Sequence, residues 1–291
     1  VAINCYTTHT MEIQVADQRI FLLKDFVTPE DAKNKAWEKK MTAFDTVSKV
    51  IGFLSRAKDE DFELTYQEHR YQPFWHVGAK SKYVYGRSAD YQVPANGSEV
   101  RRVTFQEKDY DVHNGHFHLS SIEHCQEEKQ LEVLVDGVTG KEVSDLQKYV
   151  SLTSELVTDS IESLVPQNSI IVPPQARVSA IMRQTLAKMI TGIHADTILE
   201  ENVQVTCTDL YYRPIYAFQY KWISKNKEGI LEVDGLTGDV RAGERVFSEY
   251  FGKALDKNFL FDLGGDVAGM FIPGGSIAVK VAKKYIDSKE V

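Results

Sequence analysis

The chain has 291 residues, a length that accommodates two domains of ordinary size. Hydrophobic residues make up 43% and charged residues 26%, which excludes a disordered or fibrous chain and predicts a buried core. Acidic residues outnumber lysine and arginine by 42 to 34, so the net charge is -8, and nucleic acid is not an expected partner.

Residues 11–57 predict short strands and then one long helix. Residues 11–26 carry alternating β-branched residues, which indicates one hairpin or two short strands. Thr28 and Pro29 followed by two acids mark a helix start. Apolar residues at three- and four-residue steps extend this predicted helix to about residue 57.

Strands should follow this helix, because aromatic and β-branched residues alternate with polar ones. The expected strands cover residues 62–66, 71–85, 100–105, 115–124 and 131–135. A short helix is expected over residues 144–157, before a proline-containing linker at 158–175.

The second half begins with an amphipathic pattern that predicts a helix over residues 176–194. Strands are expected at 203–209, 212–223 and 230–233. Helices are expected at 245–254 and 276–288, with a glycine-rich turn between them. No apolar run reaches the ~20 residues that a membrane-spanning helix needs.

An internal repeat is the strongest signal in the sequence. The motif Tyr-x-Pro occurs at residues 71–73 and again at 212–214, each time after a predicted long helix. The motif Val-Asp-x-x-Thr-Gly follows at 135–140 and at 233–238. Because the order is kept twice, we expect a duplication of one helix-plus-sheet unit. Proline suits a strand start or edge, and Asp-Gly suits a tight turn.

The expected fold class is α+β, with two related units that each pack a long helix on a curved antiparallel sheet, and a helical C-terminal tail. The first unit covers residues 1–157 and carries a β insertion at about 86–128. Residues 158–175 are the linker, and residues 176–291 form the second unit with its glycine-rich helical tail.

This combination of a helix, antiparallel strands and a Val-Asp-x-x-Thr-Gly ending resembles the PepSY family, with its cystatin-like folding unit. The resemblance covers about residues 173–240 and, with an insertion, residues 29–143. It implies a non-enzymatic module that regulates or binds another protein.

Aromatic residues concentrate in the predicted strands around the two Tyr-x-Pro motifs. On a sheet, alternate aromatic side chains belong to the core, and the others can form a binding face for a protein, peptide or glycan. The candidate binding residues are Tyr71, Trp75, Tyr83, Tyr85, Tyr212 and Tyr216.

Six of the eight histidines lie between residues 69 and 124. His116 and His118 should face the same side of a strand, and His124 has the same parity. These three are candidate ligands for zinc or another transition metal, and solvent-facing histidines on a sheet are the alternative interpretation.

Cysteine and nucleophile patterns indicate no catalytic residue. Cys5, Cys125 and Cys207 are far apart and form no Cys-x-x-Cys pair, so neither a disulfide framework nor a zinc ribbon is expected. His124 and Cys125 are neighbours and would point to opposite faces of a strand, which excludes a direct dyad between them.

The leading expectation is therefore a non-catalytic protein-binding or assembly module without a cofactor, forming one part of a longer polypeptide. Its partner would be another protein or the remainder of the same polypeptide. One alternative is a metal-dependent enzyme or metal sensor that uses the three histidines with zinc. Another is a ligand-binding protein with a cavity between helix and sheet.

Overall fold

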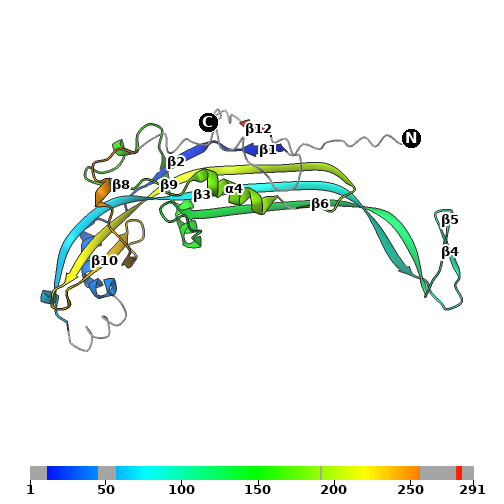
Figure 1. Ribbon diagram of the computed structural model, residues 1–291, viewed down its shortest axis with the longest axis horizontal. Coiled ribbons are helices and arrows are strands. Elements are labelled where there is room, and N and C mark those ends of the chain that lie inside the picture. The colour runs from blue at the N-terminus through cyan, green and yellow to red at the C-terminus, as the bar shows by residue number, and fades with distance from the viewer. Residues whose placement is uncertain (1–11, 45–56, 191, 256–279, 284–291) are drawn as a thin grey trace.

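The computed structural model describes residues 12–44, 57–190, 192–255 and 280–283. These residues form an elongated molecule built on one long twisted sheet, with a narrow arm at one end (Figure 1). The sheet contains ten strands, and a separate two-stranded ribbon of β4 (Arg102–Phe105) and β5 (Lys108–Asp111) lies at the tip of the arm.

Three long strands form the centre of this sheet. Strand β3 (Phe62–Pro94) runs antiparallel to β9 (Thr197–Trp222) on one side and to β6 (His116–Asp136) on the other. At about 3.3 Å per residue, the 33 residues of β3 extend on the order of 100 Å. The strands predicted separately at 115–124 and 131–135 are thus parts of one strand, as are those at 203–209 and 212–223.

Shorter strands complete the two edges of the central ribbon. The outer edge of β9 pairs in turn with β1 (Glu12–Val15), β2 (Gln18–Leu23) and β10 (Lys227–Asp234). The remaining strands of the sheet are β7 (Ser154–Leu156) on β2, β8 (Ile170–Ile171) on β3, β11 (Val240–Gly243) on β10 and β12 (Lys280–Lys283) on β1. Because β1 and β2 pair in parallel with β9, the sheet is mixed, and the described residues 12–26 contain the two short strands that were the alternative to a hairpin.

The expectation of two units, each with a long helix on its own antiparallel sheet, is wrong. Strands from both halves of the chain belong to one sheet, and the described α-helices are short: α1 (Pro29–Glu38), α3 (Gln147–Val150) and α4 (Val178–Met189). Helix α1 has the expected threonine cap, because Thr28 Oγ1 accepts the N–H of Asp31 at 3.1 Å. A 3₁₀ turn at Lys40–Ala43 follows α1, and residues 45–56 of the predicted helix lie outside the described residues.

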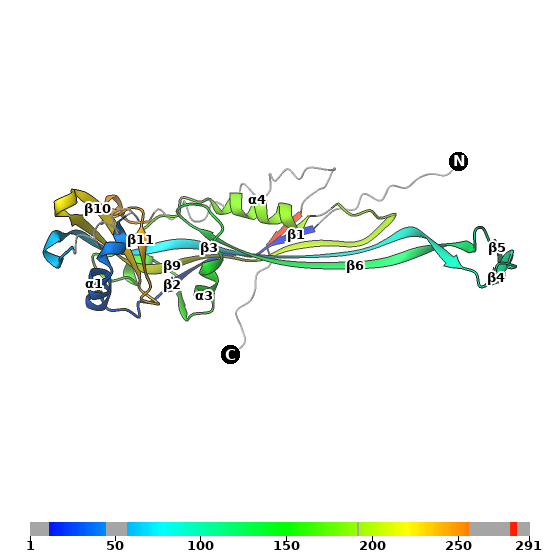
Figure 2. The same ribbon diagram turned by 90° about the horizontal axis from the view of Figure 1, so that it is seen from below.

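Each of the two longer helices covers strands from the other half of the chain. Helix α1 packs on β9 and β10, over a cluster that includes Tyr216, Tyr220 and Trp222. Helix α4 packs on β3 and β6, over a cluster that includes Trp75 and Tyr212. The even-numbered tyrosines of β9, Tyr212, Tyr216 and Tyr220, enter the two clusters, so both clusters lie on one face here, which the twist of the ribbon turns from one side to the other (Figure 2).

The two Tyr-x-Pro motifs are direct neighbours in the sheet. Tyr71 pairs with Pro214, Gln72 with Arg213, and Pro73 with Tyr212. Each Asp-Gly turn is tied to the proline on its own side, because Gly137 N–H donates to the Pro73 carbonyl and Gly235 N–H to the Pro214 carbonyl, both at 2.9 Å. The paired motifs are therefore arranged with local twofold symmetry about Gln72 and Arg213.

The segment predicted as an insertion, residues 86–128, forms the arm. Beyond residue 86, β3 has left β9 and pairs with β6 alone. The arm is therefore a two-stranded antiparallel ribbon that ends at β4 and β5 (Figures 1 and 2).

The expected helical C-terminal tail is also wrong within the described residues. Residues 245–254 form one 3₁₀ turn, Ser248–Tyr250. The turn follows Phe247, which is buried against Ile170 and Val172 and whose N–H donates to the Glu68 carboxylate, so the chain here is held by the sheet. Residues 280–283 form strand β12, and the rest of the predicted helix at 276–288, like the glycine-rich turn, lies outside the described residues.

Candidate functional site: a cleft at the free edge of strand β3

A cleft of about 760 Å³ lies beside the cluster that α1 covers. Its floor is formed by His69 of β3 with Tyr216 and Phe218 of β9. One wall is the segment from Asp25 to Lys33, which includes the first turn of α1, and the opposite wall is the loop at residues 166–169. Two exposed phenylalanines line the cleft, Phe26 at 71% and Phe251 at 55% exposure.

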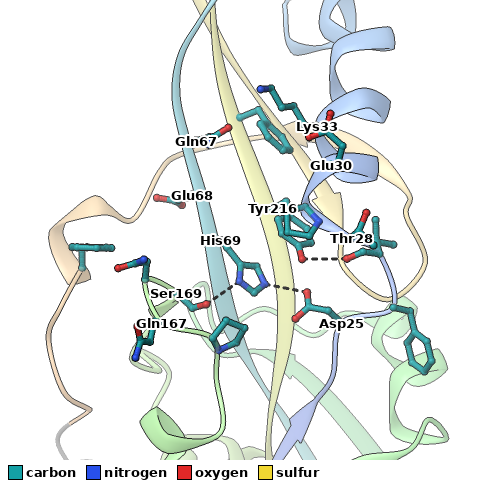
Figure 3. Close-up of a pocket in the computed structure, with 17 residues that line it drawn as sticks. Asp25, Thr28, Glu30, Lys33, Gln67, Glu68, His69, Gln167, Ser169 and Tyr216 are labelled. Carbon is teal, nitrogen blue, oxygen red and sulfur yellow. Dashed lines mark hydrogen bonds and ion pairs between the residues drawn. The ribbon is translucent and has the colours of Figure 1, made fainter.

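Three polar side chains from distant parts of the sequence meet in this cleft (Figure 3). Asp25 lies in the short connection between β2 and α1, His69 lies on β3, and Ser169 comes directly before β8. Ser169 is positioned by a turn in which its N–H donates to the Pro166 carbonyl at 3.1 Å, with Asn168 at a φ of 71°. The side chain of Asn tolerates this left-handed conformation better than most residues do.

His69 joins the other two side chains in one hydrogen-bonded row. Its Nδ1 lies 2.8 Å from Ser169 Oγ, and its Nε2 lies 3.0 Å from Asp25 Oδ1. The second Asp25 oxygen accepts the Tyr71 hydroxyl at 2.8 Å. The imidazole also stacks on Tyr216 at 4.4 Å, so the ring is fixed in both position and orientation. With Asp25 ionised, Nε2–H donates to it and Nδ1 accepts the Ser169 hydroxyl.

The carboxylate is the charged centre of the cleft. Burial acts to raise the pKa of Asp25, but the hydrogen bonds from His69 and Tyr71 outweigh burial and hold that pKa below its usual value. Burial and the adjacent Asp25 charge raise the pKa of both Tyr71 and Tyr216. Near neutral pH Asp25 is therefore a carboxylate among neutral hydroxyl donors, and the lining also includes Glu30, Lys33 and Glu68.

The cleft also exposes the backbone of β3. The Tyr71 carbonyl accepts the N–H of Val172 from the β8 side, and alternation along the strand directs the backbone groups of His69 and Gln67 to that same edge. On this edge, β3 pairs only with β8 at residues 70–71 and with β6 from Phe74 onward, among the strands that the structure describes. The register with β8 places the Ile170 N–H on the His69 carbonyl, so the His69 N–H and the backbone of Gln67 are the groups of this edge that are open to the cleft.

The six aromatic residues proposed for binding are buried, each at most 5% exposed. Trp75 donates its indole N–H to the Ala176 carbonyl at 3.0 Å, next to α4, and Tyr83 and Tyr212 belong to the same cluster. Tyr85 donates its hydroxyl to Glu127 at 2.5 Å. Tyr216 lines the cleft and Tyr71 contacts Asp25, so these two are the members of the set that take part in the site.

The three candidate metal-ligating histidines lie on β6 and are not brought together. His116 pairs with Pro94, His118 with Gln92 and His124 with Gly86 along the arm. The six-residue step from His118 to His124 corresponds to about 20 Å on a strand, more than one metal ion bridges.

A different group of ligand side chains does converge within the described part of the chain. The group consists of His76 on β3 with Cys207 and Asp209 on β9, and each residue has one ligand atom within 4.8 Å of those of the other two. Burial and the Asp209 charge raise the pKa of the Cys207 thiol to about 11, so this cysteine is not an activated nucleophile.

Sequence reasoning did not identify Asp25, Ser169 or the edge of β3. These residues are separated by 44 and 100 positions, and none carries a local motif. A polar residue directly before an apolar pair, as in Ser169 before β8, is too common a pattern to single out.

No family model matches this chain, and no curated protein or solved structure gives a match either. Among the described residues, no helix has the length and apolar character needed to cross a membrane. The site must therefore be interpreted from its own geometry.

Proposed function

We propose that the protein is a binding module that captures an extended segment of a partner protein, or of its own polypeptide, at the edge of β3 in the cleft. The observation that carries this proposal is the open backbone of Gln67, with the open N–H of His69, inside a concave site. Addition of a strand to a free sheet edge is a common mode of peptide recognition, in which main-chain hydrogen bonds supply affinity and pockets supply specificity.

The surroundings of this edge distinguish it from the other long edge, that of β6. Charged side chains stand along β6, including Glu127, Glu128 and Lys129, and such charges protect an edge from pairing. The β3 edge instead lies beside Phe26 and Phe251, which offer apolar contact to side chains of an added strand.

The cleft also defines the chemistry of its partner segment. Asp25 accepts hydrogen bonds and carries a negative charge, and the chain as a whole is acidic at -8. A segment with one apolar side chain for the two phenylalanines and a cationic or hydrogen-bond-donating side chain for Asp25 fits this lining. Long-range attraction to an acidic protein also favours a basic segment.

The proposal is tested with a library of random linear heptapeptides displayed on phage and selected against the full chain. The selected peptides are then synthesised, and their binding is measured by fluorescence anisotropy. Their affinity for Gln67→Pro should be about tenfold or more lower than for the unaltered protein, which corresponds to about 1.4 kcal/mol of binding free energy. Proline removes the outward N–H of Gln67 and leaves the ladder to β9 in place, because the hydrogen-bonding groups toward β9 belong to the neighbouring residues.

A matched control separates loss of the edge from a general effect. Gln126→Pro alters an exposed residue of β6, outside the cleft, and should leave peptide affinity within twofold. Equal binding to Gln67→Pro and to the unaltered protein would refute strand addition at this edge.

The Asp25–His69–Ser169 row favours one second candidate function, acyl transfer with Ser169 as nucleophile. Two features rank it lower. The serine lies on Nδ1 and the aspartate on Nε2, the reverse of the usual serine hydrolase order, and the Ser169 N–H is committed to Pro166 instead of an oxyanion. Labelling by a fluorophosphonate probe, abolished in Ser169→Ala and in His69→Gln, would establish this function in place of binding alone.

We also infer that the two halves of the chain derive from one duplicated unit and that the two copies have exchanged their helices. The antiparallel pairing of the two Tyr-x-Pro motifs and the matched Asp-Gly turns support this inference. A PepSY-like origin of the unit stays a prediction.

A further inference from the structure

We propose that His76, Cys207 and Asp209 form a binding site for one transition-metal ion, with Zn²⁺ as the best match. The site is independent of the cleft. It lies where β3 and β9 pair, since His76 is opposite Asp209 and Gly78 is opposite Cys207. Thiolate, imidazole and carboxylate together are a donor set typical of zinc.

The distances between the three side chains are near those that a bound ion requires. Zinc bonds of about 2.0–2.3 Å in a tetrahedron place ligand atoms about 3.3–3.8 Å apart. Cys207 Sγ lies 3.7 Å from His76 Nδ1, and all three ligand atoms lie within 4.8 Å of one another. Cys207 Sγ and His76 Nδ1 are thus already at the separation that a shared ion requires.

Charged groups lie behind two of the ligands, as outer groups do in metal sites. The His76 ring directs Nε2 toward Glu132, whose carboxylate oxygen lies 3.8 Å away. Arg19 clamps Asp209 with two hydrogen bonds of 2.8 Å. A carboxylate behind the histidine and a fixed acidic ligand are the arrangement that orients ligands and raises their basicity.

The cysteine is also held in place from the backbone. The N–H of Gly78 hydrogen-bonds the Cys207 sulfur. A Cβ at position 78 would lie 2.9 Å from that sulfur and 2.6 Å from Thr206 Oγ1, so only glycine fits opposite the thiol. This glycine keeps the sulfur at a defined distance from His76.

Burial and charge favour a bound ion at this place. The side chains of Asp209 and His76 are 3% and 9% exposed, and His76 Nε2 has no hydrogen-bond partner. A dication bound to one thiolate and one carboxylate is neutralised, and Arg19 and Glu132 balance each other beside it. Three protein ligands leave the fourth position of a tetrahedral ion to water or another small ligand.

The test uses the full chain, stripped with a chelator and then titrated with Zn²⁺ against a chromophoric competitor, and separately with Co²⁺. One equivalent should bind, and Co²⁺ should give a thiolate-to-metal charge-transfer band. Cys207→Ser should abolish the band, whereas Cys125→Ser should keep it. Glu132→Gln should weaken Zn²⁺ binding about tenfold, as outer-group changes do, and Glu128→Gln should leave it unchanged.

A second measurement needs no substitution and therefore does not depend on the folding of a variant. Zn²⁺ should slow alkylation of Cys207 about tenfold or more, because a metal-bound thiolate is not free to react, and should leave Cys125 unaffected. Equal protection of the two cysteines, a Co²⁺ band that survives in Cys207→Ser, or the absence of stoichiometric Zn²⁺ binding would each overturn the proposal.

Discussion

Arg70 is the centre of a buried ion network that should dominate the stability of the β3 edge. Its side chain is 1% exposed and donates to Glu68 at 2.6 Å and to Glu232 of β10. The guanidinium also lies 4.6 Å from the centre of the Phe247 ring. The network therefore joins β3, β10 and the chain near Phe247, one residue away from His69.

Arg70→Met should destabilise the protein by about 3–5 kcal/mol, because removal of one partner leaves buried carboxylates without their counter-charge. Glu68 keeps the Phe247 N–H and Glu232 keeps Arg241, which places the expected loss near the lower limit. At about 2–4 °C per kcal/mol, a loss of about 3 kcal/mol lowers Tm by about 6–12 °C.

Urea denaturation measures this effect directly, as a lower midpoint of unfolding in Arg70→Met than in the unaltered protein. Arg241→Met is the matched control, since Arg241 contacts the same Glu232 but is 53% exposed, and it should cost less than about 1 kcal/mol. A loss below about 1 kcal/mol in Arg70→Met would refute this reasoning.

Three further predictions concern the turns, the cleft and the core. Gly137→Ala should lower the free energy of unfolding by about 1–3 kcal/mol in urea denaturation, since a Cβ there meets a backbone carbonyl at 2.7 Å. Gly140→Ala, at a φ of 72° and with only an ordinary contact to Ala176 Cβ at 3.7 Å, should lower it by only about 1 kcal/mol. Because the pKa of Asp25 is lowered in the folded state, ionised Asp25 stabilises the fold above its unfolded pKa of about 4, and this stabilisation is lost as the pH falls through the folded pKa. In Asp25→Asn the free energy of unfolding should therefore decrease less steeply on acidification. Trp75→Ala should lower the free energy of unfolding by about 3–5 kcal/mol in urea denaturation, and it should speed hydrogen exchange in α4, which packs on this side chain. A loss below about 1 kcal/mol would contradict the packing of α4 on β3.

Local features of this fold could be predicted from the sequence. Thr28 and Pro29 gave the start of α1, and the Asp-Gly motifs gave two tight turns, because capping and turn geometry depend on adjacent residues. Most strands were also placed by their alternation. The length of the strands was not predicted, since residues 62–66 and 71–85 were expected as two strands and both belong to β3.

The arrangement of these elements could not be predicted. Pairing of β3 with β9 joins residues that are up to 160 positions apart, and no local pattern specifies it. Once that pairing exists, apolar surface of one half is available to the helix of the other, as with Trp75 beneath α4. The cleft is a product of the same pairing, which is why Asp25, His69 and Ser169 gave no signal in the sequence.

Amide hydrogen exchange at the edge of β3 tests the central claim most directly. In the free protein the amides of Gln67 and His69 should exchange rapidly, whereas those of Glu68 and Arg70, which face β9, should be protected and serve as internal controls. A saturating peptide selected on the full chain should slow exchange at Gln67 and His69 about tenfold or more, because an added strand takes up these donors. Unchanged exchange at both amides while the peptide is bound would contradict strand addition in this cleft.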